Sequence, residues 1–302
     1  MTLRRVLLIA NVGAGSAPEE DGARRERVEA AFAACGVELI ARWLPGSELA
    51  AAVRGAASLD VDAVVAAGGD GTINTVARAL AGSGMPLGIV PCGTLNHFAK
   101  DLGLPLDPEG AAKVIAAGHV RHVDLGEVNG RLFLNNSSIG AYPAAVEDRE
   151  RLRARGRRKW SAMAVAAVRT RRRFMPRHLR LDLGRARVVQ YTPAVLIANN
   201  AYRLTGAIGR RDALDGGRLW CYVTPRRGFP RLARMAMHAL CNKLDESPEL
   251  VALPVPALTV RCGARRLPVS LDGEIARLTP PLHYRIRPRH LAVLAPAPAT
   301  DR

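Results

Sequence analysis

The chain has 302 residues, of which 48% are hydrophobic, and its formal net charge is +17 at pH 7. This length is enough for two domains of ordinary size, each with its own core. Residues 1–125 contain 11 Lys and Arg against 14 Asp and Glu, whereas residues 126–302 contain 33 against 13. We therefore expect the second part of the chain to face a polyanion or an anionic membrane.

Cysteine usage and hydropathy exclude several classes of protein. The five cysteines are scattered without a CxxC pair, which argues against a disulfide framework or a zinc site and favours a reducing cytoplasm. The apolar run Val6–Ala10 is too short for a signal peptide. No stretch approaches the roughly 20 apolar residues of a membrane-spanning helix. We expect a cytoplasmic protein that associates with the inner face of the membrane only peripherally.

Apolar runs typical of buried strands alternate with helical patterns in the first part of the chain. The predicted strands are Val6–Ala10, Val37–Leu44, Asp62–Ala67 and Leu87–Pro91, and the predicted helices are Glu19–Cys35, a segment capped by Ser47 that continues through Ala57, Ile73–Leu80, His97–Leu102 and Pro108–Ala117. This alternation predicts an α/β domain with a parallel sheet over residues 1–125.

The motif Gly68-Gly-Asp-Gly-Thr-Ile-Asn74 lies between a predicted strand and a predicted helix. Its glycines lack the Cβ atoms that would keep a bulky anion away, and the N–H groups at the start of a helix attract such an anion. Asp70 is the exception, because a carboxylate in an anion site requires a bridging divalent cation. The motif predicts a phosphate cradle in which Asp70 serves Mg²⁺. A tight strand-to-helix turn with an N-capping aspartate is the alternative interpretation.

Beyond Val123 the pattern changes to short strands. Asn129-Gly130 is a strong hairpin signal between two of them. Later predicted strands are Leu179–Leu183, Arg187–Tyr191, Ala194–Asn199, Arg218–Val223, Ala257–Cys262, Pro268–Leu271 and His283–Ile286. This spacing predicts a β-sandwich domain over residues 126–290. The tail, residues 291–302, begins with an apolar run that we expect to return to the first domain.

Residues 149–177 interrupt the β-rich part with 12 Lys and Arg and a single acid, Glu150. They surround the apolar, helix-like run Trp160–Val168. One interpretation is a solvated basic excursion. The other is a surface that meets anionic lipid headgroups, to which each basic residue contributes about 1 kcal/mol.

Four blocks of sequence carry a resemblance: Asn11-Val-Gly-Ala-Gly15, Gly68-Gly-Asp-Gly-Thr72, Pro91-Cys-Gly-Thr-Leu-Asn96 and Leu271-Asp-Gly-Glu274. With these blocks in this order, the chain resembles the diacylglycerol kinase catalytic-domain family, which includes bacterial lipid kinases and sphingosine kinases. The resemblance implies a lipid kinase that uses ATP and Mg²⁺. It also implies an α/β nucleotide domain of the NAD-kinase/phosphofructokinase-like type, followed by a β-sandwich domain for the lipid substrate, with the active site between them.

The resemblance assigns roles to individual residues. The nucleotide-binding positions are Asn11, Gly15, Gly68, Gly69, Asp70, Gly71, Thr72, Ile73, Asn74, Gly93, Thr94 and Asn96. Glu274 matches the usual candidate for the general base, and Asp272 and Asp70 complete the catalytic set. In an extended segment the side chains of Asp272 and Glu274 would point the same way, so we expect them to act as a pair. Asp215 matches a structural magnesium ligand of some bacterial members, although Gly216 stands where they often have aspartate.

Three alternatives stay open. An NAD kinase shares the GGDGT sequence, but this chain has no Asn-Glu pair after it. A nucleic-acid binder would fit the basic second part, yet an aromatic content of 4% leaves few stacking partners for bases, so we expect no nucleic-acid partner. A degenerate family member would bind ligand without catalysis, but Asp70, Asp272 and Glu274 are all present. The sequence leaves open which lipid is the acceptor, what His97 does in place of a family aspartate, and the oligomeric state, for which a homodimer is one option.

Overall fold

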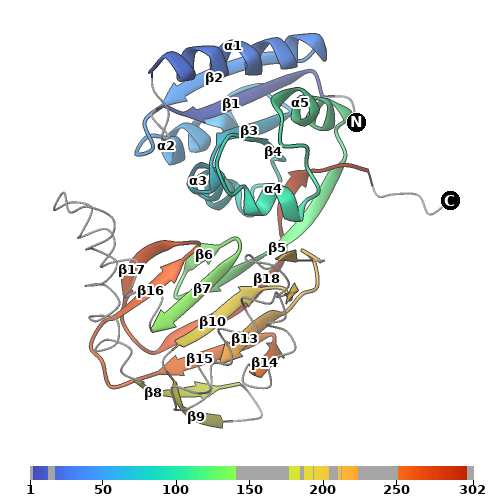
Figure 1. Ribbon diagram of the computed structural model, residues 1–302. Helices are drawn as coiled ribbons and strands as arrows, with labels where there is room; N and C mark the ends of the chain where they lie inside the picture. The colour runs from blue at the N-terminus through green and yellow to red at the C-terminus, as the bar shows by residue number, and fades with distance from the viewer. Residues whose placement is uncertain are drawn as a thin grey trace. The chain divides into compact units, whose positions relative to one another are not determined.

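The computed structural model describes residues 3–12, 18–140, 177–183, 187–192, 194–203, 210–211, 213–223 and 251–297. The chain divides into two compact units (Figure 1). The N-terminal unit comprises residues 1–124 and 289–302, and the C-terminal unit comprises residues 125–288.

The N-terminal unit is built on a parallel sheet in the order β2-β1-β3-β4-β18. Its strands are β1 (Arg5–Asn11), β2 (Glu38–Leu44), β3 (Ala63–Gly68), β4 (Leu87–Pro91) and the end of β18 (Leu282–Leu294). All residues of β3 and β4 are buried, as is typical of parallel strands covered on both faces. The predicted α/β fold of this part is confirmed.

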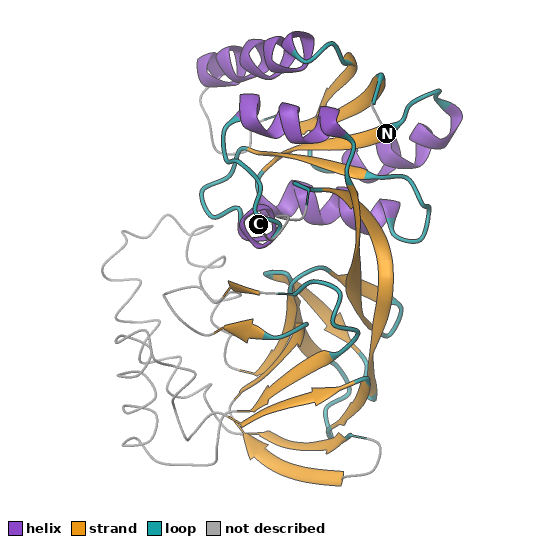
Figure 2. Cartoon of the chain, turned by 90° about the vertical axis from the view of Figure 1, so that its right-hand side faces the viewer, coloured by secondary structure: helices purple, strands orange, loops and turns teal. Residues whose placement is uncertain are grey.

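Helices lie on both faces of this sheet (Figure 2). They are α1 (Pro18–Ala34), α2 (Leu49–Arg54), the short 3₁₀ helix η1 (Gly55–Ser58), α3 (Asp70–Leu80), α4 (His97–Asp101) and α5 (Pro108–Ala117). Helix α1 contacts α5, and α2 contacts α3. The predicted apolar stripe of α3 is buried: Ile73, Val76 and Ala77 are 0% exposed.

The predicted cap of the second helix is wrong. Glu48, not Ser47, is the N-cap residue of α2, and no side chain caps this helix end. Glu48 itself has helical backbone angles, so the chain enters the helix without the extended cap conformation that a serine cap requires. In α5, by contrast, the Asp107 carboxylate accepts the Gly110 N–H at 2.7 Å.

The C-terminal unit consists mainly of antiparallel strands in two sheets. One sheet has the order β14-β13-β10-β7-β16-β17, and the other contains β18, β15, β8 and β9, with β5 attached to β18 and β6 attached to β5. Their bounds are β5 (Val120–Val128), β6 (Arg131–Phe133), β7 (Asn136–Gly140), β8 (Arg177–Asp182), β9 (Arg187–Thr192), β10 (Ala194–Asn199), β13 (Leu219–Val223), β14 (Val251–Val255), β15 (Ala257–Arg261), β16 (Leu267–Leu271) and β17 (Glu274–Leu278). A further pair is β11 (Tyr202–Arg203) with β12 (Arg210–Arg211).

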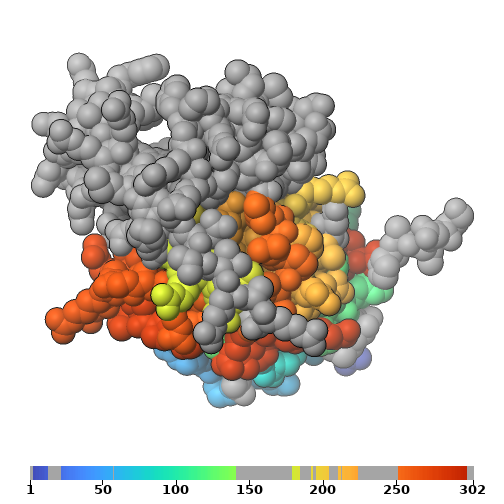
Figure 3. Space-filling model, turned by 90° about the horizontal axis from the view of Figure 1, so that it is seen from below, coloured from blue at the N-terminus to red at the C-terminus, as the bar shows by residue number. Residues whose placement is uncertain are grey.

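The two sheets of this unit share one apolar core. Ile139, Ile197 and Val269 come from the first sheet, and Leu181 and Val260 come from the second; all five side chains are buried in one cluster. The predicted β-sandwich is thus confirmed. In Figure 1 the green β7 lies beside the orange β16, although more than 120 residues separate them in the chain. Figure 3 shows the yellow and orange surface that this unit presents from below.

The strand β18 is longer than predicted. The runs His283–Ile286 and Leu291–Leu294 belong to one strand of 13 residues. Arg289 interrupts its regular geometry with φ of 51°, and the Arg289 N–H is bound by the buried Asp124 carboxylate at 2.8 Å. Among the described residues, no helix is both long and apolar enough to span a membrane.

Candidate active site

Two glycines, one at the end of β3 and one after β4, lie where a larger side chain would collide with neighbouring atoms. A Cβ atom on Gly68 would lie 2.6 Å from Oγ1 of Thr72. A Cβ on Gly93, in the turn after β4, would lie 2.7 Å from the Cα of Gly69. The two glycine turns therefore contact each other through their backbones. Gly71 differs, because a Cβ there would meet no atom of the described residues within 4 Å.

Asp70 connects these two turns. Its Oδ1 accepts the N–H of His97 at 2.8 Å, and its Oδ2 accepts the N–H of Asn96 at 3.0 Å. Asn96 is the N-cap residue of α4 and has φ of 51°. Its side-chain amide closes the second turn by bonding both the N–H and the C=O of Gly93, at 2.9 and 2.8 Å. The aspartate thus caps the start of α4 rather than that of its own helix α3.

The N-terminus of α3 has the features of an anion site. The first helical hydrogen bond runs from Ile73 N–H to Gly69 C=O at 3.1 Å, so the N–H groups of Asp70, Gly71 and Thr72 precede the helical ladder. Asn74 is 2% exposed, and its Oδ1 is buried without a hydrogen-bond partner in the described part of the chain. A buried amide oxygen in this state indicates a water molecule or a ligand donor beside it.

Other predicted nucleotide-binding residues lie at the same edge of the sheet. The register pairs Ala10 with Ala67 and Gly68 with Pro91, so β1, β3 and β4 end side by side. Asn11, which ends β1, is half-buried. Thr94, after β4, is exposed. Ligands of open α/β sheets bind at this carboxyl edge of the strands. Gly15 lies outside the described residues.

In the C-terminal unit, Asp272 and Gly273 form the two-residue turn between β16 and β17. Their φ angles are 51° and 90°, which are the positive values of a type I′ hairpin turn. The expectation of an extended segment from Asp272 to Glu274 is therefore wrong, because the chain reverses between Leu271 and Glu274, which are paired across the hairpin. Glu274 is exposed at the start of β17.

The segment containing Asp215 carries only part of the predicted metal site. Asp215 is exposed. A Cβ on Gly216 would lie 2.8 Å from Oδ1 of Asn200, so an aspartate at this position would not fit without movement of that side chain. Within the described residues, no group of three or more His, Cys, Asp or Glu side chains could hold a metal ion.

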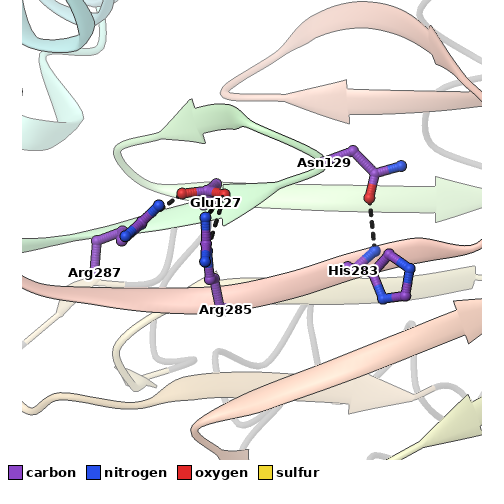
Figure 4. Close-up of polar contacts among 5 residues, drawn as sticks. All are labelled: Glu127, Asn129, His283, Arg285 and Arg287. Carbon is purple, nitrogen blue, oxygen red and sulfur yellow. Dashed lines mark hydrogen bonds and ion pairs between the residues drawn. The ribbon is translucent and has the colours of Figure 1, made fainter.

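A cluster that the sequence did not indicate lies on β5 and β18 (Figure 4). The Glu127 side chain is 7% exposed and bonds two guanidinium groups, those of Arg285 at 2.6 and 2.9 Å and of Arg287. Burial raises the pKa of Glu127, but the hydrogen bonds and charges of the two arginines outweigh this and lower the pKa below its usual value. The arginines follow Glu127 by 158 and 160 residues, so no local motif could indicate the contact.

This cluster borders a pocket of about 720 Å³ in the C-terminal unit. There the Asn129 side chain contacts β18 and accepts the backbone N–H of His283 at 2.8 Å (Figure 4). Thr259 lies 3.2 Å from the His283 ring. None of the predicted site residues lines this pocket, so it adds no support to the predicted chemistry.

The first part of the chain is similar to a known protein family. Residues 5–128 match the family model of the diacylglycerol kinase catalytic domain. The matched residues include the β3 turn, the β4 turn and the N-terminus of α3.

Curated relatives match over part of the chain. A probable lipid kinase YegS-like of Pseudomonas aeruginosa is 45% identical over 125 residues, which are 39% of this chain and 41% of that protein. A diacylglycerol kinase of Bacillus subtilis is 45% identical over 92 residues, 30% of each chain. The matches thus span less than half of these relatives.

Solved structures extend the likeness to the whole fold. The crystal structure of a putative diacylglycerol kinase from Bacillus anthracis superimposes with a TM-score of 0.76 and 22% identity over 99% of both chains. At this identity the match establishes the fold: an α/β unit and an antiparallel β unit in one chain.

Proposed function

We propose that the chain is an ATP-dependent lipid kinase that transfers the γ-phosphate of Mg-ATP to a lipid hydroxyl. The observation that carries this proposal is the pair of contacting glycine turns at the carboxyl edge of a parallel sheet, beside the open position of Gly71 at the start of α3. An anion is favoured at such a helix start. The relatives are named as lipid or diacylglycerol kinases, which supports a lipid as the phosphate acceptor.

The ATP phosphates would bind the N–H groups that precede the helical ladder of α3. The unpartnered Oδ1 of Asn74 is an acceptor, so its partner would be a donor such as a water molecule or a ligand hydroxyl and not a phosphate oxygen. Mg²⁺ in such sites is usually held by one or two carboxylates together with substrate phosphates, and each oxygen of Asp70 accepts one backbone N–H and so keeps a lone pair for it. The cation would neutralise charge on the transferring phosphoryl group.

In the proposed reaction the lipid hydroxyl oxygen bonds to the γ-phosphorus while the bond from this phosphorus to the β–γ bridging oxygen breaks, which releases ADP. The hydroxyl proton passes to Glu274, an exposed carboxylate at the start of β17. A carboxylate suits this role, because orientation matters more than basicity in a loose transition state. Attachment to an anionic membrane surface through the basic residues 149–177 belongs to the same proposal; nearly all of that stretch lies outside the described residues.

Incubation with γ-labelled ATP, Mg²⁺ and a total lipid extract in mixed micelles tests the proposal. We expect label in a lipid that mass spectrometry identifies as a phosphorylated diacylglycerol, sphingoid base, ceramide or polyprenyl alcohol. Parallel reactions with NAD and without lipid are the controls. Label that enters only NAD, or only free phosphate, would refute the lipid kinase assignment.

A further inference from the structure

The segment Leu134–Asn136, which links β6 to β7, is bound from one side by Asp272. All three of its N–H groups point to that carboxylate: Leu134 N–H reaches Oδ2 at 2.8 Å, and the next two reach Oδ1 at 2.7 and 3.1 Å. In return, the Asp272 N–H donates to Asn136 C=O at 2.9 Å. Successive N–H groups that converge in this way form an anion-binding concavity, and a side chain of the same protein fills it.

From the other side, Arg211 and Asn199 bind the same segment. Leu134 C=O accepts hydrogen bonds from Arg211 Nη1 at 2.8 Å and from Asn199 Nδ2 at 2.9 Å. Asn135 C=O accepts the Asn199 N–H at 2.9 Å, and Asn135 Oδ1 accepts from Arg211 Nη2 at 2.6 Å. Every backbone N–H and C=O of the segment is therefore engaged, which fixes its position relative to β10 and β16.

Arg211 is an unusual residue to find in this place. It is 1% exposed, its guanidinium lies 5.7 Å from the Tyr202 ring centre, and it also donates to Asn199 C=O at 3.2 Å. Burying a guanidinium is costly, and a planar fork of fixed donors is the property that only arginine offers here. The contacts indicate that an arginine lies at this position because its donors fit the acceptors of Leu134, Asn135 and Asn199, more than because it stabilises the fold.

The segment in turn determines where Glu274 lies. Asp272 is the first residue of the two-residue turn, and Glu274 follows directly after it. β16 also pairs with β7 just beyond the segment, through Leu271 and Ser137. The Asp272 carboxylate thus attaches the tip of the hairpin to Leu134–Asn136, two residues from the proposed base.

We propose that Asp272 and Arg211 are positioning residues that hold Leu134–Asn136 between them and thereby fix the hairpin that carries Glu274. Asp272 acts through the backbone N–H groups that it binds and takes no proton from the substrate. This inference rests on the proposed lipid kinase function. It revises the role of Asp272, which the sequence grouped with the catalytic residues.

Two substitutions at position 272 separate positioning from chemistry. Asp272→Asn and Asp272→Gly both tolerate the positive φ of the turn. Asparagine keeps one neutral oxygen for the N–H groups, whereas glycine keeps none, and neither can act as a base. We expect Asp272→Gly to slow single-turnover transfer by about 10²-fold, as misplacement of a reacting group does, with ATP affinity unchanged. The single-turnover rate of Asp272→Asn should be about tenfold higher than that of Asp272→Gly.

Hydrogen exchange at Leu134, Asn135 and Asn136 measures the positioning without reference to activity. We expect about tenfold faster exchange of these amides in Asp272→Gly and an intermediate rate in Asp272→Asn. Glu274→Gln is the matched control, because it should lose transfer while these amides keep their protection. Equal loss of transfer in the asparagine and glycine variants, with unchanged exchange, would overturn the proposal and make Asp272 a chemical participant.

Arg211→Lys tests the other side of the segment, since lysine keeps the charge and loses the fork. We expect faster exchange of the same three amides and a lower single-turnover rate, again with unchanged ATP affinity. A folded Arg211→Lys variant with the amide exchange rates and the transfer rate of the wild type would contradict the positioning role of Arg211. If this variant does not fold, the two Asp272 variants decide alone. If the wild-type protein phosphorylates no lipid, the proposed function fails, while the exchange data still show whether the segment is held as described.

Discussion

The glycine turn of the N-terminal unit and the hairpin turn of the C-terminal unit solve a similar problem with an aspartate. Asp70 binds two consecutive backbone N–H groups, those of Asn96 and His97, and Asp272 binds three, in Leu134–Asn136. The surroundings differ, because Asp70 begins a helix whose first N–H groups precede the helical ladder, whereas Asp272 lies in a two-residue hairpin turn. The comparison teaches that an acid in a glycine-containing motif can bind the backbone, and that of these two aspartates Asp70 does so at the N-terminus of a helix.

The largest expected effect on the chemical step comes from Glu274, the acid proposed as the general base, and distinguishes it from Asp70 and Asp272. Glu274→Gln should lower the rate of the chemical step by about 10²–10⁴-fold, the usual contribution of a general base. ATP affinity and the midpoint of thermal unfolding should stay unchanged, because the side chain is exposed. Single-turnover transfer, nucleotide binding and calorimetry measure these. Loss of ATP binding with normal transfer from bound ATP would instead make Glu274 a nucleotide or metal residue.

Asp70→Asn tests whether Asp70 resembles Asp272 as closely as its hydrogen bonds indicate. We expect loss of most turnover and about tenfold weaker nucleotide binding, a change of roughly 1.4 kcal/mol. The weaker binding should persist for ADP in the presence of EDTA, because the β4 turn is displaced whether or not Mg²⁺ is present. Isothermal titration with and without Mg²⁺ measures both cases. A defect seen only with Mg²⁺ would assign Asp70 to the metal alone, and full activity would remove it from the site.

Gly93→Ala should destabilise the N-terminal unit by about 1–3 kcal/mol, the usual range for overpacking. The new Cβ would lie 2.7 Å from the Gly69 backbone, which cannot move as a side chain can. Gly71→Ala is the matched control, since no described atom lies within 4 Å of its Cβ, and it should not destabilise the fold. Chemical denaturation of both variants measures the difference. Equal stability of the two would show that the turns do not contact as described.

The smallest expected effect concerns Glu127, the carboxylate of the C-terminal unit that binds side chains instead of backbone. Its folded pKa is lowered, so its contribution to stability is complete above the ordinary pKa near 4.5 and is lost as the pH falls through the lowered folded value. We expect Glu127→Gln to flatten this acid limb of the unfolding midpoint against pH. Asp182→Asn, which changes a second acid that lines the pocket, is the control variant in the same measurement. An unchanged acid limb in Glu127→Gln would show that the arginine pair is not coupled to folding.

The sequence predicted the parts of the fold that depend on local pattern. The buried run before Gly68 and the apolar spacing after it specified β3 and α3, and Asn129-Gly130 specified a hairpin whose φ angles are 46° and 80°. Strand β7, Asn-Ser-Ser-Ile-Gly, was not predicted, because its polar residues break the alternation of a half-buried strand. Its Ser137 is nevertheless 0% exposed, with a hydrogen bond to the Tyr284 hydroxyl at 2.9 Å.

The sequence supplied candidate site residues but not the contacts between them. The glycine motif indicated Asp70, and the family resemblance indicated Gly93 and Asn96. The hydrogen bonds from Asp70 to Asn96 and His97, however, join residues that are 26 and 27 positions apart. The extended geometry assumed for Asp272 failed because an Asp-Gly pair favours positive φ. Arg211 had no signal in the sequence, since the residues to which it donates the hydrogen bonds described above lie 12 to 77 positions away.

The return of β18 to the N-terminal unit has a consequence for the order in which the protein is made. Val293 pairs with Leu87 of β4, and residues from both sides of this strand bind the unit, through His290 C=O to Gly82 N–H and Ala295 N–H to His119 C=O. A ribosome that has synthesised residues 1–124 has therefore made all of this unit except residues 289–302, which supply one strand of its sheet. Until about 170 further residues emerge, the edge of β4 stays open for pairing, a period in which exposed strand edges favour aggregation. The N-terminal unit, although most of it comes first in the chain, can be completed only after the C-terminal unit has been made.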